Sequence, residues 1–304
     1  MKRTLILIGL LSCVCSFAAP QRELVWPKGK MPDAQEHQIA AMTDETSQEG
    51  FKPEKHRVAY LDWFDAPAPE KRNGGCMVLI SGGAYQSCCD VRYIKEWSEK
   101  LTDLGFQCVN LVYRTPRPVG LAIYQTAWED GQRAIRLVRS EAAERGLDPD
   151  RIGIMGSSAG GHLTLMGVTS SLHKAYLPID EMDKKVPCNV QWGIGIYPAY
   201  ALTDGDDQHN IHGGNEDSDI LVPEFSFDLA TAPMIFIHGD ADGWASMNSV
   251  KCWEKMRAMG IQSELHTLAL RKHCFQHYSS PGTGSYTHLD RIWDFLTAKG
   301  FVTR

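Results

Sequence analysis

The sequence predicts an α/β fold, with a mostly parallel central sheet covered by helices on both faces. Short apolar segments typical of buried strands alternate with longer segments whose apolar residues recur at helical spacing. This alternation is typical of parallel sheets built from crossover units. The 304-residue chain has 43% hydrophobic and 22% charged residues, a composition that allows a large core.

Seven segments have the apolar, β-type composition of strands, and several are apolar at every position, as expected of strands buried on both faces. They are residues 57–64, 76–80, 107–113, 152–155, 190–197, 234–237 and 264–268. Helices are expected between them, near residues 94–104, 124–145, 250–259 and 287–299. The first three end at Gly105, Gly146 and Gly260, a position where glycine favours helix termination.

The net charge and the cysteines limit the classes of partner. With a formal net charge of −6, nothing suggests a nucleic-acid binder, which would normally carry a basic face, so no nucleic-acid partner is expected. Cys88 and Cys89 are adjacent, which suits neither a redox C-x-x-C pair nor zinc spacing. Most cysteines are expected to be small buried hydrophobic residues.

A nucleophile is predicted where the strand at residues 152–155 runs into a G-x-S-x-G sequence, Gly156 to Gly160, followed by a helix-forming run. The turn between strand and helix is so sharp that neighbours of the central serine need almost no side chain, and the two glycines meet that need. Ser158 then lies at a helix N-terminus, where the helix dipole favours a developing alkoxide. A phosphate-binding turn is the alternative, but its G-K-[ST] ending is absent.

A serine nucleophile needs a histidine base and a carboxylate to orient it, in the chain order Ser, Asp or Glu, His. Asp240 and Asp242 follow the strand at residues 234–237. His273 follows the strand at 264–268 by a short loop and is the favoured base, with His277 as the alternative. The other histidines have weaker positions: His266 within a strand, His288, His238 as a packed residue, and His209 and His212 in a long polar loop at residues 201–230. That loop is expected to border the substrate pocket.

An oxyanion-binding turn is expected after the strand at residues 76–80. The sequence Ser81-Gly82-Gly83-Ala84-Tyr85 has small residues that allow backbone N–H groups to approach a substrate oxygen. The N–H of Ala159, directly after the nucleophile, is the expected second source of donors.

These motifs together resemble the bacterial carbohydrate-esterase and acetylxylan-esterase-like branch of the α/β-hydrolases, which also contains feruloyl esterases. The resemblance is carried by S-G-G-A-Y at residues 81–85, D-P-D-R-I-G-I-M-G-S-S-A-G-G-H-L at 148–163, H-G-D-A-D at 238–242 and K-H-C-F at 272–275. It implies the α/β-hydrolase fold. It also favours Asp242 as the acid, because strand-H-G-x-x-D is the arrangement of that superfamily, and leaves Asp240 to hold the turn.

The resemblance further implies Gly83, Ala84 and Ala159 as oxyanion donors, and Tyr85 and Gln86 as lining for the acyl or sugar side. Asp130 resembles a structural acid that ties its helix to a loop through Arg114 or Arg117. Two motifs depart from the family pattern, because S-G-G-A-Y replaces H-G-G-G or P-G-G-G-Y, and R-K-H-C-F replaces G-G-H-G-F.

The N-terminal segment has the organisation of a secretory signal peptide, with Lys2 and Arg3 before an apolar run and small residues after it. We expect residues 1–19 to be a signal peptide, 20–55 an N-terminal extension that wraps the domain, and 56–304 an α/β-hydrolase catalytic domain. A lipid anchor on Cys13 is the alternative to a cleaved, secreted or periplasmic protein. No later apolar stretch is long enough to span a membrane.

The expected activity is therefore that of a serine esterase acting on a small-molecule or polysaccharide ester. An acyl-enzyme reaction of this kind needs no metal or cofactor. Acetyl groups on xylan or related plant oligosaccharides are the first expectation, and feruloyl groups are the second. An amidase or peptidase of the same fold and a catalytically inactive binding protein are the further alternatives.

Overall fold

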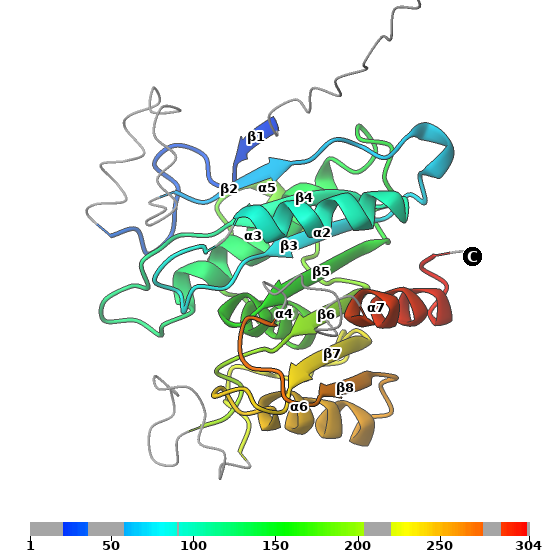
Figure 1. Ribbon diagram of the computed structural model, residues 1–304. Coiled ribbons are helices and arrows are strands. Elements are labelled where there is room, and N and C mark those ends of the chain that lie inside the picture. The colour runs from blue at the N-terminus through cyan, green and yellow to red at the C-terminus, as the bar shows by residue number, and fades with distance from the viewer. Residues whose placement is uncertain (1–20, 36–57, 90, 204–219, 276–286, 303–304) are drawn as a thin grey trace, which may run out of the picture.

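The computed structural model describes residues 21–35, 58–89, 91–203, 220–275 and 287–302, and Figure 1 shows their arrangement. One sheet of eight strands forms the centre, in the order β1-β2-β4-β3-β5-β6-β7-β8. β1 and β2 are antiparallel to their neighbours, and the other neighbouring strands are parallel. The strands are β1 (Gln21–Leu24), β2 (Tyr60–Trp63), β3 (Cys76–Ile80), β4 (Gln107–Val112), β5 (Ile152–Ser157), β6 (Trp192–Ile196), β7 (Met234–Gly239) and β8 (Glu264–Leu268).

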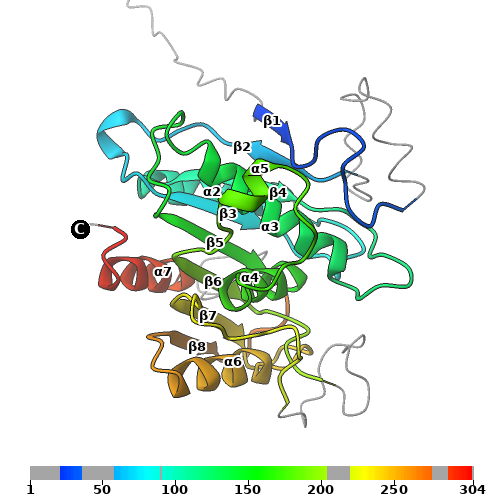
Figure 2. The ribbon, with the colours of Figure 1, turned by 180° about the vertical axis from the view of Figure 1, so that it is seen from behind.

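Helices cover both faces of the sheet, as the two opposite views show (Figures 1 and 2). They are α2 (Val91–Asp103), α3 (Gln125–Ser140), α4 (Ala159–Thr169), α5 (Glu181–Lys185), α6 (Met247–Ala258) and α7 (Thr287–Ala298), with a short 3-10 helix η1 (Pro69–Lys71). α2 and α7 pack on one face, against a core that includes Met77, Leu79 and Met155. α3, α4 and α6 pack on the other, against a core that includes Val78 and Ile154.

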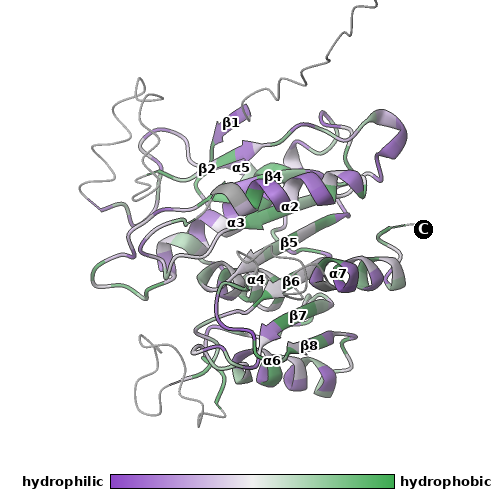
Figure 3. Cartoon of the chain, viewed as in Figure 1, coloured by the Kyte–Doolittle hydropathy of each residue, from purple (hydrophilic) through white to green (hydrophobic). Residues whose placement is uncertain are grey.

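Neighbouring residues of one strand belong to different cores, because successive side chains of a strand point to opposite faces of the sheet. β3 and β7 are buried at every position, because both of their faces carry helices. Figure 3 shows the same pattern in hydropathy: the central strands are largely green, and the surface of α2 is largely purple. The predicted α/β-hydrolase architecture, with a mostly parallel sheet and helices on both faces, is confirmed.

The seven predicted strands are all present, and the chain adds an eighth, β1, within the N-terminal extension. β1 is short, polar and largely exposed, so it has no apolar run by which to predict it. α3 ends at Ser140, five residues before the predicted end, and turns continue the chain to Gly146.

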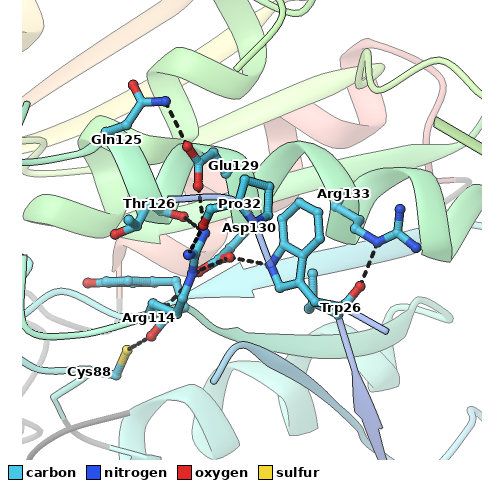
Figure 4. Close-up of polar contacts among 11 residues, drawn as sticks. Trp26, Pro32, Cys88, Arg114, Gln125, Thr126, Glu129, Asp130 and Arg133 are labelled. Carbon is cyan, nitrogen blue, oxygen red and sulfur yellow. Dashed lines mark hydrogen bonds and ion pairs between the residues drawn. The ribbon is translucent and has the colours of Figure 1, made fainter. Parts of the chain in front are cut away.

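The described part of the extension is fixed to α3 by a buried polar cluster (Figure 4). The Trp26 indole N–H donates to Asp130 Oδ1 at 2.6 Å. Arg114 donates to the same carboxylate through its backbone N–H and its Nε, both at 2.8 Å, and through Nη1 to the Pro32 carbonyl at 2.6 Å. The expectation that Asp130 ties its helix to a loop is confirmed, with Arg114 as the partner.

Within the described ranges, no helix is long and apolar enough to cross a membrane. Five of the seven cysteines in this part of the chain are buried, in agreement with their expected role as small packing residues. The predicted signal peptide and the possible anchor at Cys13 lie outside the described residues.

Candidate active site

Ser158 lies at the sharp turn between β5 and α4, in the backbone conformation that the G-x-S-x-G sequence predicts. Its φ is 53° and its ψ is −122°, a conformation that non-glycine residues seldom adopt. The glycines explain how the turn closes. A Cβ on Gly156 would lie 2.2 Å from the Gly160 carbonyl oxygen, and a Cβ on Gly160 would lie 2.5 Å from the carbonyl oxygens of Ile80 and Ser81.

The carboxyl ends of β5 and β7 and the segment after β8 bring three side chains together. Ser158 Oγ lies 2.8 Å from His273 Nε2, and His273 Nδ1 lies 2.8 Å from Asp242 Oδ2. A carboxylate only accepts hydrogen bonds, so Nδ1 carries the imidazole proton and Nε2 is left to accept the serine hydroxyl. This is the order in which a base removes a proton from a serine nucleophile.

Asp242 is buried, with its carboxylate surrounded by donors. Oδ1 accepts from the Trp244 N–H at 2.8 Å, and Oδ2 lies 3.3 Å from His238 Nε2 as well as close to His273. Burial alone would raise the pKa of Asp242, but the hydrogen bonds of His238 and His273 outweigh it and lower that pKa to about 2. The carboxylate is therefore ionised throughout the neutral range, as a group that orients an imidazolium must be.

His238 is fully buried and serves Asp242 rather than substrate. Its Nε2 faces two acceptors, the Asp242 carboxylate and the Trp244 carbonyl at 3.0 Å, so this nitrogen carries the proton. Its Nδ1 then accepts from the Ser249 hydroxyl at 2.8 Å. The expectation of a packed, hydrogen-bonded histidine agrees with this position.

The rival residues are placed elsewhere or outside the described residues. Asp240 accepts from the Leu270 N–H at 2.5 Å and holds the turn after β7, as expected. His266 contacts Glu264 within β8, and His288 is buried on α7. His209, His212 and His277 lie outside the described residues, as do residues 204–219 of the long loop.

The expected oxyanion loop lies against the nucleophile. A Cβ on Gly82 would lie 2.9 Å from Ser158 Cβ, so the loop backbone passes directly beside the serine. Gly83, Ala84 and Tyr85 all have positive φ, at 126°, 55° and 58°. In the described part of the chain, no backbone carbonyl accepts from the N–H groups of Gly83, Ala84 and Ala159. N–H groups in these positions on both sides of Ser158 can receive a substrate oxygen, and their role as oxyanion donors stays a prediction.

The two expected substrate contacts differ in exposure. Gln86 is exposed, and with its amide oxygen turned toward Arg117 it lies 2.5 Å from Nε and 3.1 Å from Nη2 of that guanidinium. Tyr85 is 1% exposed, and its hydroxyl is engaged inside the protein with His162 Nδ1 at 2.8 Å. The substrate contacts of Tyr85 and Gln86 both stay predictions. The hydrogen bond of the Tyr85 hydroxyl to His162 does not support a substrate contact for Tyr85.

Several residues near the site were not predicted from the sequence. His162 stands in the nucleophile segment, one helical turn after Ser158, and that spacing alone could have identified it as a neighbour of the site. Glu224, from the end of the long loop, lies 3.2 Å from His162. Trp244 and Tyr197 flank His273, with ring centroids 6.0 and 4.7 Å from the imidazole. Only the tertiary structure brings these residues together.

The fold and this arrangement of serine, histidine and aspartate define the α/β-hydrolase class of proteins. A solved esterase structure from Thermogutta terrifontis, with propionate bound, has the same fold. It superimposes with a TM-score of 0.70 at 21% identity, over 94% of this chain and 96% of that one.

The BD-FAE family model, for bifunctional acetylxylan and feruloyl esterases, matches residues 61–256. The chain belongs to this family of carboxylic ester hydrolases. The family resemblance predicted from the motifs is thereby confirmed.

Two curated relatives share part of the sequence. Esterase LipQ of Mycobacterium tuberculosis is 30% identical over 158 residues, which are 51% of this chain and 36% of LipQ. An acetylxylan esterase of Xylanibacter ruminicola is 29% identical over 130 residues, which are 39% of this chain and 25% of that protein. This chain therefore spans about a quarter to a third of the length of these relatives.

Proposed function

We propose that this protein is a serine esterase that removes acetyl groups from xylan or related plant-polysaccharide oligosaccharides through an acyl-enzyme. The observation that carries the proposal is the continuous hydrogen-bonded chain from Ser158 Oγ through His273 to Asp242, with 2.8 Å at each step. Membership of a family of acetylxylan and feruloyl esterases supports the substrate class.

In the proposed reaction, Ser158 Oγ attacks the acyl carbonyl carbon while His273 Nε2 takes the hydroxyl proton. The negative charge on the carbonyl oxygen is received by the N–H groups of Gly83, Ala84 and Ala159. The sugar alkoxide leaves with the proton from His273, and the acyl group stays on Ser158. Water then attacks the ester carbonyl with His273 again as base, which releases the carboxylic acid and restores the serine hydroxyl.

Feruloyl ester hydrolysis is the second candidate, and the aromatic surroundings of the base favour it. Trp244 lies beside His273 and contacts Tyr200, with 4.9 Å between the ring centroids of these two aromatic residues. The Trp244 ring is partly exposed and can stack on a cinnamoyl group, which an acetyl group does not need, while buried Tyr200 supports it from within the protein. Secretion or a periplasmic location, expected from the N-terminal segment, would give either activity access to a polymer.

The deciding experiment compares acetate release from acetylated xylan with ferulate release from feruloylated arabinoxylan, and includes an aminoacyl amide substrate. We expect acetate release to be the fastest and to be lost in Ser158→Ala. Faster ferulate release would assign the second candidate. Hydrolysis of the amide alone, or full activity of Ser158→Ala, would contradict the proposed function.

A further inference from the structure

A buried tyrosine and a buried histidine join the two backbone segments that flank the nucleophile. Tyr85 directly follows Ala84 in the oxyanion loop, and His162 lies in the first turn of α4, three residues after Ala159. The Tyr85 hydroxyl and His162 Nδ1 are 2.8 Å apart, and both side chains are buried. The contact therefore connects the loop that carries the expected donors Gly83 and Ala84 to the helix that carries the expected donor Ala159.

A third residue fixes the imidazole from its other side. Glu224 Oε1 lies 3.2 Å from His162 Nε2, and the Glu224 side chain is only 4% exposed. Phe225 packs on the same imidazole, with 5.1 Å between ring centroids. Glu224 and Phe225 belong to the segment after the long loop, so three separate parts of the chain meet at His162.

Of these contacts, the one between Tyr85 and His162 has the geometry of a hydrogen bond. Burial raises the pKa of the Tyr85 phenol well above its usual value, so the hydroxyl keeps its proton and can donate to Nδ1. The Glu224 carboxylate lies within ion-pair distance of Nε2 but outside hydrogen-bond geometry, so it adds an electrostatic contact with the imidazole.

The oxyanion loop needs such an anchor because its backbone is strained. Ala84 and Tyr85 are consecutive non-glycine residues with φ of 55° and 58°. Each residue in this region costs about 1–2 kcal/mol relative to ordinary backbone conformations, and such strain persists only where the surroundings enforce it. The Tyr85 side chain supplies the enforcing contacts, through His162 and through an edge contact with Tyr113 at 5.8 Å between centroids.

We infer that Tyr85, His162 and Glu224 act together as positioning residues, which hold the oxyanion loop against the N-terminus of α4 in the geometry that stabilises the transition state. Tyr113 assists, because its hydroxyl donates to the Ser81 carbonyl at 3.1 Å. This inference rests on the proposed function for its kinetic consequence, but its structural consequence is independent of any activity.

The structural consequence is tested by hydrogen–deuterium exchange of the backbone amides at residues 83–87. Tyr85→Phe removes only the hydroxyl, and we expect exchange in this segment to become at least tenfold faster. Tyr176→Phe is the matched control, since it deletes a tyrosine hydroxyl that donates to Asp183 Oδ1 at 2.6 Å on another part of the surface. Unchanged exchange of residues 83–87 in Tyr85→Phe would overturn the inference, even in a protein without esterase activity.

The kinetic consequence is tested with p-nitrophenyl acetate and with a trifluoromethyl ketone, which binds as a tetrahedral adduct. Tyr85→Phe and Glu224→Gln are each expected to lower kcat at least tenfold with KM within twofold, and to weaken the ketone by the same factor. A rise in KM with kcat unchanged would assign Tyr85 to substrate contact instead, and overturn the positioning role. An inactive wild type would contradict the proposed function, while the exchange experiment would still decide the inference.

The double variant tests whether the three residues act together. If they do, removing one contact removes most of their joint effect, so Tyr85→Phe combined with Glu224→Gln lowers kcat little more than the stronger single variant. Fully additive losses would overturn the joint positioning role.

Discussion

A methyl group added to Gly160 should displace the oxyanion loop, and the structure allows the size of the effect to be worked out. The new Cβ would lie 2.5 Å from the carbonyl oxygens of Ile80 and Ser81, whereas real Cβ contacts are essentially never below 3.0 Å. Both oxygens belong to backbone at the start of the oxyanion loop, so the overlap cannot be relieved by a side-chain rotation. The loop or α4 must move by at least about half an ångström.

Such a shift carries separate costs in catalysis and stability. A misplacement of about 1 Å can lower a rate by about 100-fold, so we expect Gly160→Ala to lower kcat by roughly 10- to 100-fold, or about 1.4–2.7 kcal/mol in activation free energy. Overpacking should lower the free energy of unfolding by about 1–3 kcal/mol. The assay is kcat for p-nitrophenyl acetate, normalised to the active serines counted with an organophosphate, together with Tm.

Gly131→Ala is the matched control, because the same substitution in α3 would place a Cβ at an ordinary 3.5 Å from a Leu163 methyl group. It should leave kcat unchanged and raise stability by up to about 1 kcal/mol, since alanine is the better helix former. If Gly160→Ala kept kcat within threefold of the wild type, the oxyanion loop would not depend on the close approach of Gly160.

Three further outcomes follow from the site and the extension. Asp242→Asn, which reverses the hydrogen-bond preference at His273 Nδ1, should lower kcat by about 10³- to 10⁴-fold with p-nitrophenyl acetate. Burial, reinforced by a hydrogen bond with Asp33, raises the pKa of Glu129 to about 8. The folded state then holds this proton more tightly than the unfolded state, so the contribution of Glu129 to stability is fully present below about pH 4.5 and is lost as the pH rises through 8. Glu129→Gln should therefore flatten Tm measured between pH 5 and 9, and an equally steep profile would contradict this assignment. Trp26→Ala should lower the free energy of unfolding in urea by about 3–5 kcal/mol with kcat unchanged, because the buried indole fixes the extension to α3; an unchanged urea midpoint would show that this anchor contributes nothing.

Much of the fold was accessible from the sequence because the central strands carry their own signal. β3 and β7 are buried on both faces, so their apolar runs have no alternation to obscure them. β1 has the opposite character: its four residues form an edge strand whose pairing with β2 depends on contacts far away in sequence. Arg22, for example, is fixed by a bidentate ion pair with Asp62, at 2.8 and 2.9 Å. No local pattern predicts such a partner.

Some residues of the candidate site could likewise be predicted from the sequence, and others could not. Ser158, Asp242 and His273 each follow a recognisable strand, and the carboxyl ends of parallel strands meet at one edge of a sheet, so their proximity could be predicted. The roles of His238 and His162 were harder to predict, because the sequence does not distinguish a histidine that packs in a core from one that positions a catalytic group. His238 lies 3.3 Å from Asp242, and His162 lies 2.8 Å from Tyr85. Only these distances distinguish a positioning histidine from one that packs in the core.

The site therefore depends on backbone that local propensity does not favour. Ser158, Ala84 and Tyr85 all have positive φ although none is glycine, and they lie in the two segments that carry the expected oxyanion donors. A sequence optimised for local conformational preference would relax these residues and move the N–H groups of both segments. The hydrogen bond between Tyr85 and His162 opposes that relaxation with a contact between distant segments. The site thus needs tertiary contacts to hold a backbone conformation that its own residues do not favour.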